Sequence, residues 1–240
     1  MQSAQNRAAD VPGGAAETPI RPVEQMESDL LELIGTVQSQ HLRQLLAATF
    51  APGSSTWISF RRAPAAKHYH QAYAHGLLEH CLTVAQAVSV ASAVFPGIDR
   101  DVAVTGALLH DIGKLEAYEM SGTGIEMSDR GRLHGEIALG YFRIRSEIER
   151  IDGFPEDVSR ALLHIILSHH GSLEHGSPVV PCTREATLVH MADNLGSKLG
   201  SFDRVERALA DGAQWAHYDK GIGACAYFGA SPEPVRAQAA

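Results

Sequence analysis

Hydrophobic side chains recur along most of this chain with the spacing of amphipathic helices. Between residues 77 and 95, the apolar or small positions 77, 81, 84, 88, 91 and 95 advance by alternating steps of four and three, which places them on one helical face. Similar stripes run through residues 102–110, 135–148, 155–170 and 184–199. Strands and helices do not alternate and no internal repeat is present, so the pattern predicts an all-α fold, a bundle of helices.

Other segments interrupt the helical pattern. Residues 1–25 are rich in Ala, Gly, Pro and polar residues without periodicity, which predicts a disordered N-terminal tail. Residues 26–50 follow as a helical pair that either packs on the core or forms a dimer interface. Three glycines around residues 118–133 predict a short β-hairpin or lid. Thr183 is expected to cap the helix predicted over residues 184–199. We expect one domain over residues 26–230 and a C-terminal tail over residues 231–240.

Composition narrows the class of protein. A chain of 240 residues is long enough to bury a sizeable core, and its net charge of −8 provides no general basic surface for nucleic acid. Cys81, Cys182 and Cys225 lie far apart without C-x-x-C spacing, which indicates neither a disulfide framework nor a zinc–cysteine site. The N-terminus lacks the apolar core of a signal peptide, and no uninterrupted apolar run approaches a membrane span. We therefore expect a soluble cytoplasmic protein without a membrane partner.

Titratable side chains occupy the inward stripes of four predicted helices. They are His80, His110, His169 and Asp193, and Asp111 follows His110 directly within the apolar run ALLHDIGKLEAY. A single buried histidine is usually a core residue with satisfied hydrogen bonds. Four helices that each direct an imidazole or a carboxylate inward are difficult to sustain without a shared cation, because burying unpaired charges is costly. The pattern predicts a divalent metal ion held by nitrogen and oxygen ligands.

Several short motifs carry a family resemblance. LLEH, LLHDIGK and HMADN resemble the H…HD…D motif of the HD-domain metal-dependent phosphohydrolases, and RLHGEIALG and LSHHG are similar to the members with a second metal ion. More narrowly, segments from PAAKHYHQAY to EATLVHMADNLGSK resemble the HD half of the bacterial YhaM-type 3′–5′ exoribonucleases. The resemblance runs from about residue 42 to residue 228 and implies an HD-domain helical bundle.

The resemblance also implies the residues of the site. The metal ligands would be His80, His110, Asp111 and Asp193 for one ion, with Asp111 bridging to a second ion held by His134, His169 and His170. The two ions would be Mn²⁺, Fe²⁺ or Mg²⁺ and would activate water for hydrolysis of a phosphoester. Asp111 and Lys114 are the expected catalytic groups, although Lys114 could equally be a solvated lysine at a helix end. His70, Tyr73, Lys114 and Lys198 are the candidates for contact with the substrate.

Departures from the family pattern bear on the substrate. The exoribonucleases join an OB-fold nucleic-acid-binding domain to the HD domain, whereas only a tail precedes Met26, so that domain is expected to be missing or supplied by a separate nucleic-acid-binding partner. Gln71 stands in place of a second histidine, His75 in place of a glycine, and Gly196 where an acidic residue is common. His190 is assigned to the structural histidines, although it lies one helical turn before Asp193.

Four functions are compatible with these residues. The leading hypothesis is a metal-dependent phosphodiesterase that acts like a 3′–5′ exoribonuclease on single-stranded or short oligonucleotides. The main alternative is a nucleotide phosphohydrolase, either a nucleotidase or a cyclic nucleotide phosphodiesterase. A non-catalytic nucleotide-binding HD module and an HD-type di-iron oxygenase complete the set. A homo-oligomer is compatible with each of them.

Overall fold

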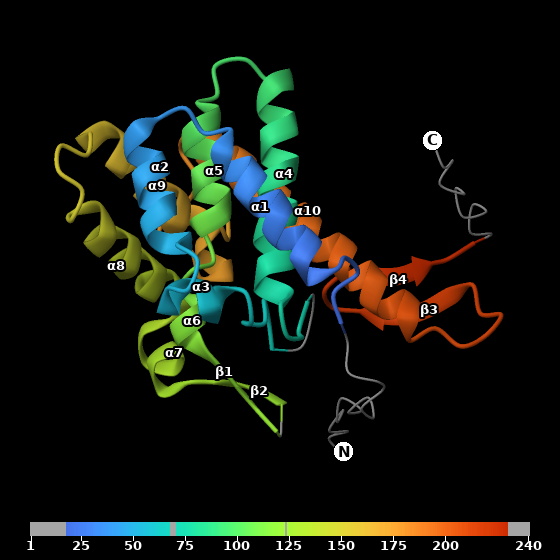
Figure 1. Ribbon diagram of the computed structural model, residues 1–240. Helices are drawn as coiled ribbons and strands as arrows, with labels where there is room; N and C mark the ends of the chain where they lie inside the picture. The colour runs from blue at the N-terminus through green and yellow to red at the C-terminus, as the bar shows by residue number, and fades with distance from the viewer. Residues whose placement is uncertain (1–17, 68–70, 123, 230–240) are drawn as a thin grey trace, which may run out of the picture.

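Helices dominate the computed structural model, which describes residues 18–67, 71–122 and 124–229 (Figure 1). The elements are α1 (Val23–Gly35), α2 (Gln40–Phe50), α3 (Ser55–Phe60), α4 (Gly76–Val94), α5 (Arg100–Leu109), α6 (Lys114–Ala117), β1 (Tyr118–Ser121), β2 (Gly124–Met127), α7 (Asp129–His134), α8 (Glu136–Ile148), α9 (Glu156–Ser168), a 3₁₀ turn (Leu173–His175), α10 (Arg184–Arg207), β3 (Trp215–Asp219) and β4 (Ala224–Tyr227). The predicted mainly helical fold is confirmed.

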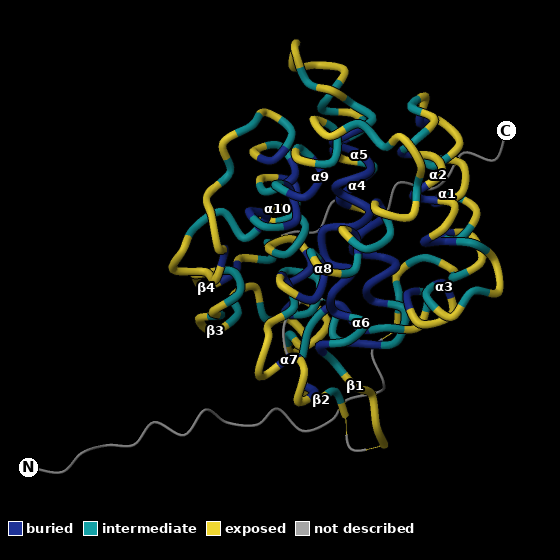
Figure 2. The backbone as a smooth tube through the Cα atoms, turned by 90° about the vertical axis from the view of Figure 1, so that its left-hand side faces the viewer, coloured by how far each residue is buried: buried dark blue, intermediate teal, exposed yellow. Residues whose placement is uncertain are grey.

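The centre of the bundle is formed by α4 and α5, which pack along one another. Helix α10 contacts α4, α5 and α9, and α9 packs against α5 and α8. The most deeply buried stretches of the backbone belong to these central helices (Figure 2). Leu77, Leu82, Leu108 and Leu109 are fully buried between them. The apolar stripes found in the sequence therefore face one common core.

Helix α4 is apolar on most of its surface. In length and composition it could cross a membrane, although Glu79 and His80 interrupt its apolar run. Half of its most apolar stretch is buried within the protein, and the same helix carries the buried His80. A core helix meets the same criteria as a membrane span, and its contacts with α5 and α10 explain its composition.

Two antiparallel hairpins accompany the helices. Strands β1 and β2 pair Tyr118 with Met127, which confirms the hairpin expected around residues 118–133. Strands β3 and β4 form a second hairpin that the sequence did not predict, and it packs against the C-terminal half of α10 through the ion pair of Arg204 with Asp219 at 2.6 Å. Most of its residues are exposed or half-buried, so the strands lack the alternation of apolar and polar residues that identifies a half-buried strand.

The N-terminal helix starts earlier than expected. Helix α1 begins at Val23 rather than at residue 26, and Pro22 precedes it, in a position compatible with a helix start. The backbone N–H of Ile20 donates to Glu79 Oε1 at 3.1 Å, which ties residues before α1 to α4. Met26 and Leu30 are buried in the core, so α1 packs on the domain. Most of the expected N-terminal tail and all of the C-terminal tail lie outside the described residues.

Candidate metal centre

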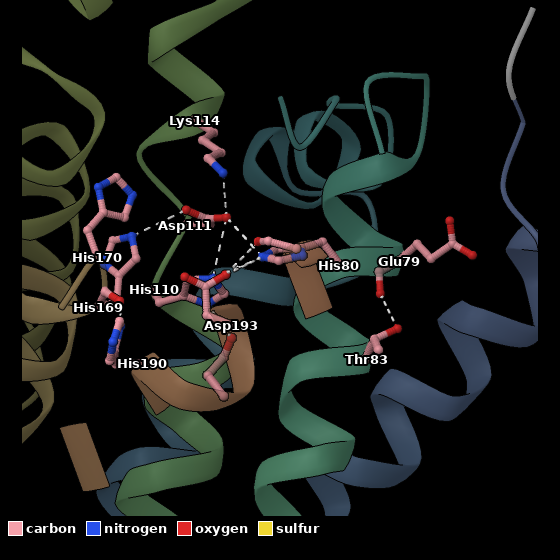
Figure 3. A network of polar contacts seen from close by, with 12 residues as sticks. Glu79, His80, Thr83, His110, Asp111, Lys114, His169, His170, His190 and Asp193 are labelled. Atoms are coloured by element: carbon pink, nitrogen blue, oxygen red, sulfur yellow. Dashed lines mark hydrogen bonds and ion pairs between the residues drawn. The ribbon is translucent and has the colours of Figure 1, made fainter. Parts of the chain in front are cut away.

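The helices α4, α5, α9 and α10 bring the predicted ligands other than His134 to one place (Figure 3). His80 lies on α4, His110 and Asp111 directly follow α5, His169 directly follows α9, and Asp193 lies on α10. The side chains of His80, His110, Asp111 and His169 are buried. The cap predicted for α10 is confirmed, because the backbone N–H of Ala186 donates to Thr183 Oγ1 at 3.1 Å.

A first cluster joins α4, α5 and α10. His80 Nε2 lies 3.1 Å from Asp193 Oδ1 and 3.4 Å from Asp111 Oδ2. His110 Nε2 lies 3.4 Å from Asp111 Oδ2 and 3.3 Å from His80 Nε2. Ligands of one transition-metal ion sit about 2.0–2.2 Å from it, which places neighbouring ligand atoms about 3 Å apart. The separations in this cluster therefore match a shared cation.

A second cluster lies on the other side of Asp111. His169 Nε2 is 3.5 Å from Asp111 Oδ1, and His170 Nε2 is 3.2 Å from Glu136 Oε1. Glu136, His169 and His170 each offer one ligand atom within 4.8 Å of the others. The two oxygen atoms of Asp111 thus face different clusters, as a bridging carboxylate would.

The approach of α8 to this centre depends on Gly113. A Cβ atom at this position would lie 1.9 Å from the carbonyl oxygen of Glu136 and 2.6 Å from the backbone nitrogen of Gly140. Because glycine lacks that atom, the turn after Asp111 packs directly on the first turn of α8. This close approach brings the Glu136 carboxylate to the histidines that follow α9.

The donor atoms of the centre fit a cation. Nδ1 of His110 donates to the carbonyl oxygen of Ala107, and Nδ1 of His169 donates to that of Ile166, both at 2.7 Å. In the neutral imidazole, each Nε2 then carries a lone pair directed at the carboxylates. Asp111 Oδ1 and His169 Nε2 are buried and have no hydrogen-bond partner among the described residues. Buried polar atoms without partners are costly, and a metal ion between them would satisfy both.

The charges of the centre also favour binding of a cation. Burial alone would lower the pKa of His110, but the charges of Asp111 and Asp193 and their hydrogen bonds raise it to about 10. Burial would raise the pKa of Asp193, but hydrogen bonds from His110 and His80 hold it well below its usual range. Burial lowers the pKa of His169, which keeps that imidazole neutral. The first cluster therefore attracts positive charge, and the second offers a free imidazole lone pair.

Lys114 lies within the centre. Its side chain is buried, and Nζ donates to Asp111 Oδ2 at 2.7 Å. Burial would lower the pKa of Lys114, but the carboxylates of Asp111 and Glu136 raise it above its usual value, so the ammonium stays charged. Because the side chain is buried, the alternative of a solvated lysine is wrong for this residue.

The remaining candidates lie elsewhere. His134 is exposed at the end of α7 and, among the described residues, belongs to none of the clusters of potential ligands. Tyr73 is buried and donates to Glu79 Oε2 at 2.6 Å, and the exposed Lys198 donates to the carbonyl oxygen of Ile222 at 3.2 Å in the second hairpin. His70 lies outside the described residues. The roles proposed for these residues stay predictions, and for Tyr73 and Lys198 the present contacts are structural.

Two residues of the site were not anticipated from the sequence. Glu136 opens the buried stripe of α8 that continues through Gly140, Ile144 and Ile148 at steps of four, and this spacing was the available signal. His190, assigned above to the structural histidines, donates from Nδ1 to the carbonyl oxygen of His169 at 2.7 Å.

A cavity of about 300 Å³ opens beside the second cluster. His190 lines it together with His170, His175, Asp193, Asn194 and Ser197. The cavity is lined by Asp193 of the first cluster and by His169 and His170 of the second, so a molecule bound in it would lie beside both clusters.

Comparisons with known proteins agree with these motifs. The HD domain family matches residues 77–197, which is 121 of the 240 residues. The 3′–5′ exoribonuclease YhaM of Bacillus subtilis (strain 168) is 28% identical over 197 residues, which are 82% of this chain and 61% of that protein. The chain thus spans about 61% of the length of this relative. No solved structure matches. The chain belongs to the HD domain family of metal-dependent phosphohydrolases.

Proposed function

We propose that this chain is a two-metal phosphodiesterase that removes nucleotides from the 3′ end of single-stranded RNA or short oligonucleotides. The observation that carries the proposal is the convergence of His80, His110, Asp111 and Asp193 beside a second cluster on the same carboxylate. Similarity to an exoribonuclease over 82% of the chain supports the choice of substrate. We further propose that it is a cytoplasmic enzyme and that a separate protein or a second copy extends its RNA-binding surface.

The chemistry needs the ions and the protein together. When bound, two divalent cations supply a hydroxide nucleophile at neutral pH and polarise a phosphoryl oxygen. His80, His110, Asp111 and Asp193 would hold the first cation, and Asp111, His169, His170 and Glu136 would hold the second. We infer that Mn²⁺, Fe²⁺ or Mg²⁺ serves, since all accept such nitrogen and oxygen ligands. His134 and His70 stay candidates for ligand and substrate contact, respectively.

Lys114 acts in this proposal through Asp111. Its ammonium group holds Oδ2 in place and keeps the carboxylate ionised, because its positive charge and that of His110 lower the pKa of Asp111 against the effect of burial. The buried position favours this positioning role over direct contact with the phosphate. The backbone carbonyl oxygens that accept from His110 and His169 likewise direct both Nε2 atoms toward the bridging carboxylate.

The cavity favours a second candidate function, a nucleotide phosphohydrolase. Its volume of about 300 Å³ is at the lower end for small-molecule sites. None of the described residues that line it is a lysine or an arginine. A groove that follows a polynucleotide is usually basic, whereas this chain has a net charge of −8. A mononucleotide or a cyclic nucleotide would need only the metal centre and this cavity.

One experiment separates the two functions. The Mn²⁺-loaded protein is offered 5′-labelled single-stranded RNA, and in parallel a mononucleotide. Asp111→Ala serves as the inactive variant, and Asp157→Ala, which replaces an exposed carboxylate of α9, is the matched control. A ladder that shortens from the 3′ end, absent only in Asp111→Ala, supports the exonuclease. Phosphate released from the mononucleotide while the RNA stays intact supports the nucleotidase, and no reaction with either substrate contradicts both.

A further inference from the structure

Cys81 lies beside the metal centre, but the proposed hydrolysis gives it no role. It follows His80 on α4 and is 0% exposed, whereas Cys182 and Cys225 are exposed. Its Sγ atom, one nitrogen of His110 and one oxygen of Asp111 all lie within 4.8 Å of one another. The thiol therefore meets the centre from the same helix that carries the first ligand.

The position of Cys81 follows from helix geometry. Neighbouring residues on a helix diverge by about 100°, so His80 and Cys81 leave α4 in different directions. Because α4 packs closely along α5, both directions still lead to the end of α5, where His110 and Asp111 lie. Two sets of potential ligands result, one with His80 and Asp193 and one with Cys81 and Asp111, and they share His110.

We propose that Cys81, His110 and Asp111 form an alternative binding site for a thiophilic divalent cation such as Zn²⁺ or Cd²⁺, and that its occupation excludes the arrangement used for hydrolysis. A thiolate prefers these cations to Mn²⁺ or Mg²⁺, which prefer oxygen ligands. In tetrahedral zinc sites, bonds of about 2.3 Å to sulfur and about 2.0 Å to nitrogen place the ligand atoms about 3.5 Å apart. The three ligand atoms lie within 4.8 Å of one another, so they reach that geometry by a contraction of at most about 1.3 Å.

The charges also suit such an ion. One thiolate and one carboxylate supply two negative charges to a divalent cation, and the neutral imidazole supplies a lone pair. The thiol proton is released to water when the cation binds. Asp111 additionally has an Oδ1 atom that is buried and without a hydrogen-bond partner among the described residues. When His110 and Asp111 bind the thiophilic cation, they no longer complete the first cluster with His80 and Asp193. Occupation of the thiolate site therefore inhibits hydrolysis.

The competing explanation is that Cys81 is an inert core residue. It belongs to the hydrophobic core together with Leu77 and Leu78, and buried cysteines commonly act as small apolar side chains. An inert thiol predicts no contact between sulfur and a metal ion. Spectroscopy of the sulfur–metal bond separates the two explanations without any assay of hydrolysis.

The test uses the full chain with the two exposed cysteines replaced, Cys182→Ser/Cys225→Ser, after removal of metal with a chelator. Cd²⁺ is titrated in, and the thiolate-to-cadmium charge-transfer absorbance is followed in the ultraviolet. We expect a band that saturates at one equivalent and that needs more Cd²⁺ when Mn²⁺ is present in excess. Addition of Cys81→Ser, or of Cys81→Ala as a second variant, should remove the band, while thermal denaturation verifies that each variant is folded.

The outcomes are distinct. No band in the double variant, or an undiminished band after Cys81→Ser, overturns the proposal. A second experiment, which rests on the proposed function, measures how strongly Zn²⁺ inhibits the hydrolysis supported by Mn²⁺. There Cys81→Ser should require at least about tenfold more Zn²⁺, since loss of even an outer partner costs about tenfold in metal affinity. If the unmodified protein hydrolyses neither substrate, the function fails, but the cadmium band still decides the proposed site.

Discussion

Lys114 Nζ and Asp111 Oδ2 form a buried ion pair at 2.7 Å, one helical turn apart along the chain. The same oxygen atom lies 3.4 Å from Nε2 of both His80 and His110. A metal ion bound by the first cluster would therefore share this oxygen atom with the ammonium group. In the metal-free protein, Lys114 supplies much of the positive charge that the carboxylates require.

Replacing Lys114 with methionine should destabilise the metal-free protein more than the metal-bound protein. Removing one partner of a buried ion pair costs about 3–5 kcal/mol, because the other charge stays buried. After removal of metal with a chelator, urea denaturation should give Lys114→Met a free energy of unfolding about 3 kcal/mol lower than that of the unmodified protein. Adding Mn²⁺ should then stabilise the variant more than it stabilises the unmodified protein.

Lys198→Met is the matched control, since Lys198 is exposed and its substitution should change stability by about 0.5 kcal/mol or less. Equal losses in the two variants, or a loss that Mn²⁺ does not reduce, would show that the Lys114–Asp111 pair does not hold the charge of the centre.

Binding of Mn²⁺ should tighten as the pH rises. The pKa of His110 is raised to about 10, so this imidazole carries an extra proton at neutral pH in the metal-free protein. Coordination requires the lone pair on Nε2 and therefore displaces that proton. The apparent affinity should increase by about tenfold per pH unit below pH 10 if one proton is released per ion.

Calorimetric titrations at two pH values, each in buffers of different ionisation enthalpy, measure the affinity and the number of protons released. An affinity independent of pH, with no proton released, would mean that His110 is neutral before the metal binds.

Glu136 and His134 should differ in their effect on the second metal ion. The carboxylate of Glu136 lies 3.2 Å from His170 Nε2, whereas His134 is exposed two residues earlier. Glu136→Gln keeps the shape of the side chain but removes its charge, so we expect one Mn²⁺ per chain to be lost in equilibrium dialysis. His134→Gln should retain the stoichiometry of the unmodified protein. If instead His134→Gln loses an ion, the assignment of His134 as a ligand is correct and the loop after α7 must rearrange.

Gly171 should tolerate alanine less well than Gly153 does. Both glycines have a positive φ, 81° and 69°, which costs an alanine about 1–2 kcal/mol. A Cβ atom at Gly171 would also lie 2.0 Å from Cε1 of His190, whereas nothing lies within 4 Å of one at Gly153. His190 would have to give up its hydrogen bond to the carbonyl oxygen of His169, which adds about 1 kcal/mol.

Urea denaturation of the two alanine variants measures this difference, and their Mn²⁺-dependent hydrolysis shows whether the cavity is disturbed. Equal stability and equal activity would mean that His190 can move without consequence.

The sequence predicted the parts of the site that depend on helical periodicity. Apolar stripes are continued by His80, His110, His169 and Asp193. A polar residue in register with such a stripe is expected to point toward the core. Asp111 could be included because it stands next to His110 at the end of a helix. For the same reason the helices α4, α5, α9 and α10 were expected close to their observed places.

Features that depend on contacts between distant elements were missed. Glu136 reaches the centre only because Gly113 allows α8 to approach, and the spacing within α8 indicates a buried face without showing what that face contacts. Lys114 could be placed near the centre, but whether it would face Asp111 or solvent depends on how the turn after α5 folds. The second hairpin depends on contacts with α10, such as the ion pair of Arg204 and Asp219, because its strands have little buried surface of their own.

The wide spacing of the ligands has a consequence for biosynthesis. His80 and Asp193 are 113 residues apart in the chain (193 − 80), and their side chains meet only when α10 has docked on α4. During translation, the first cluster cannot assemble until α10 has left the ribosome, so a cation that needs all of its members would bind only after nearly complete folding of the domain. A chain that stalls or is cleaved before α10 would have His80, His110 and Asp111 but lack the Asp193 carboxylate that completes the first cluster.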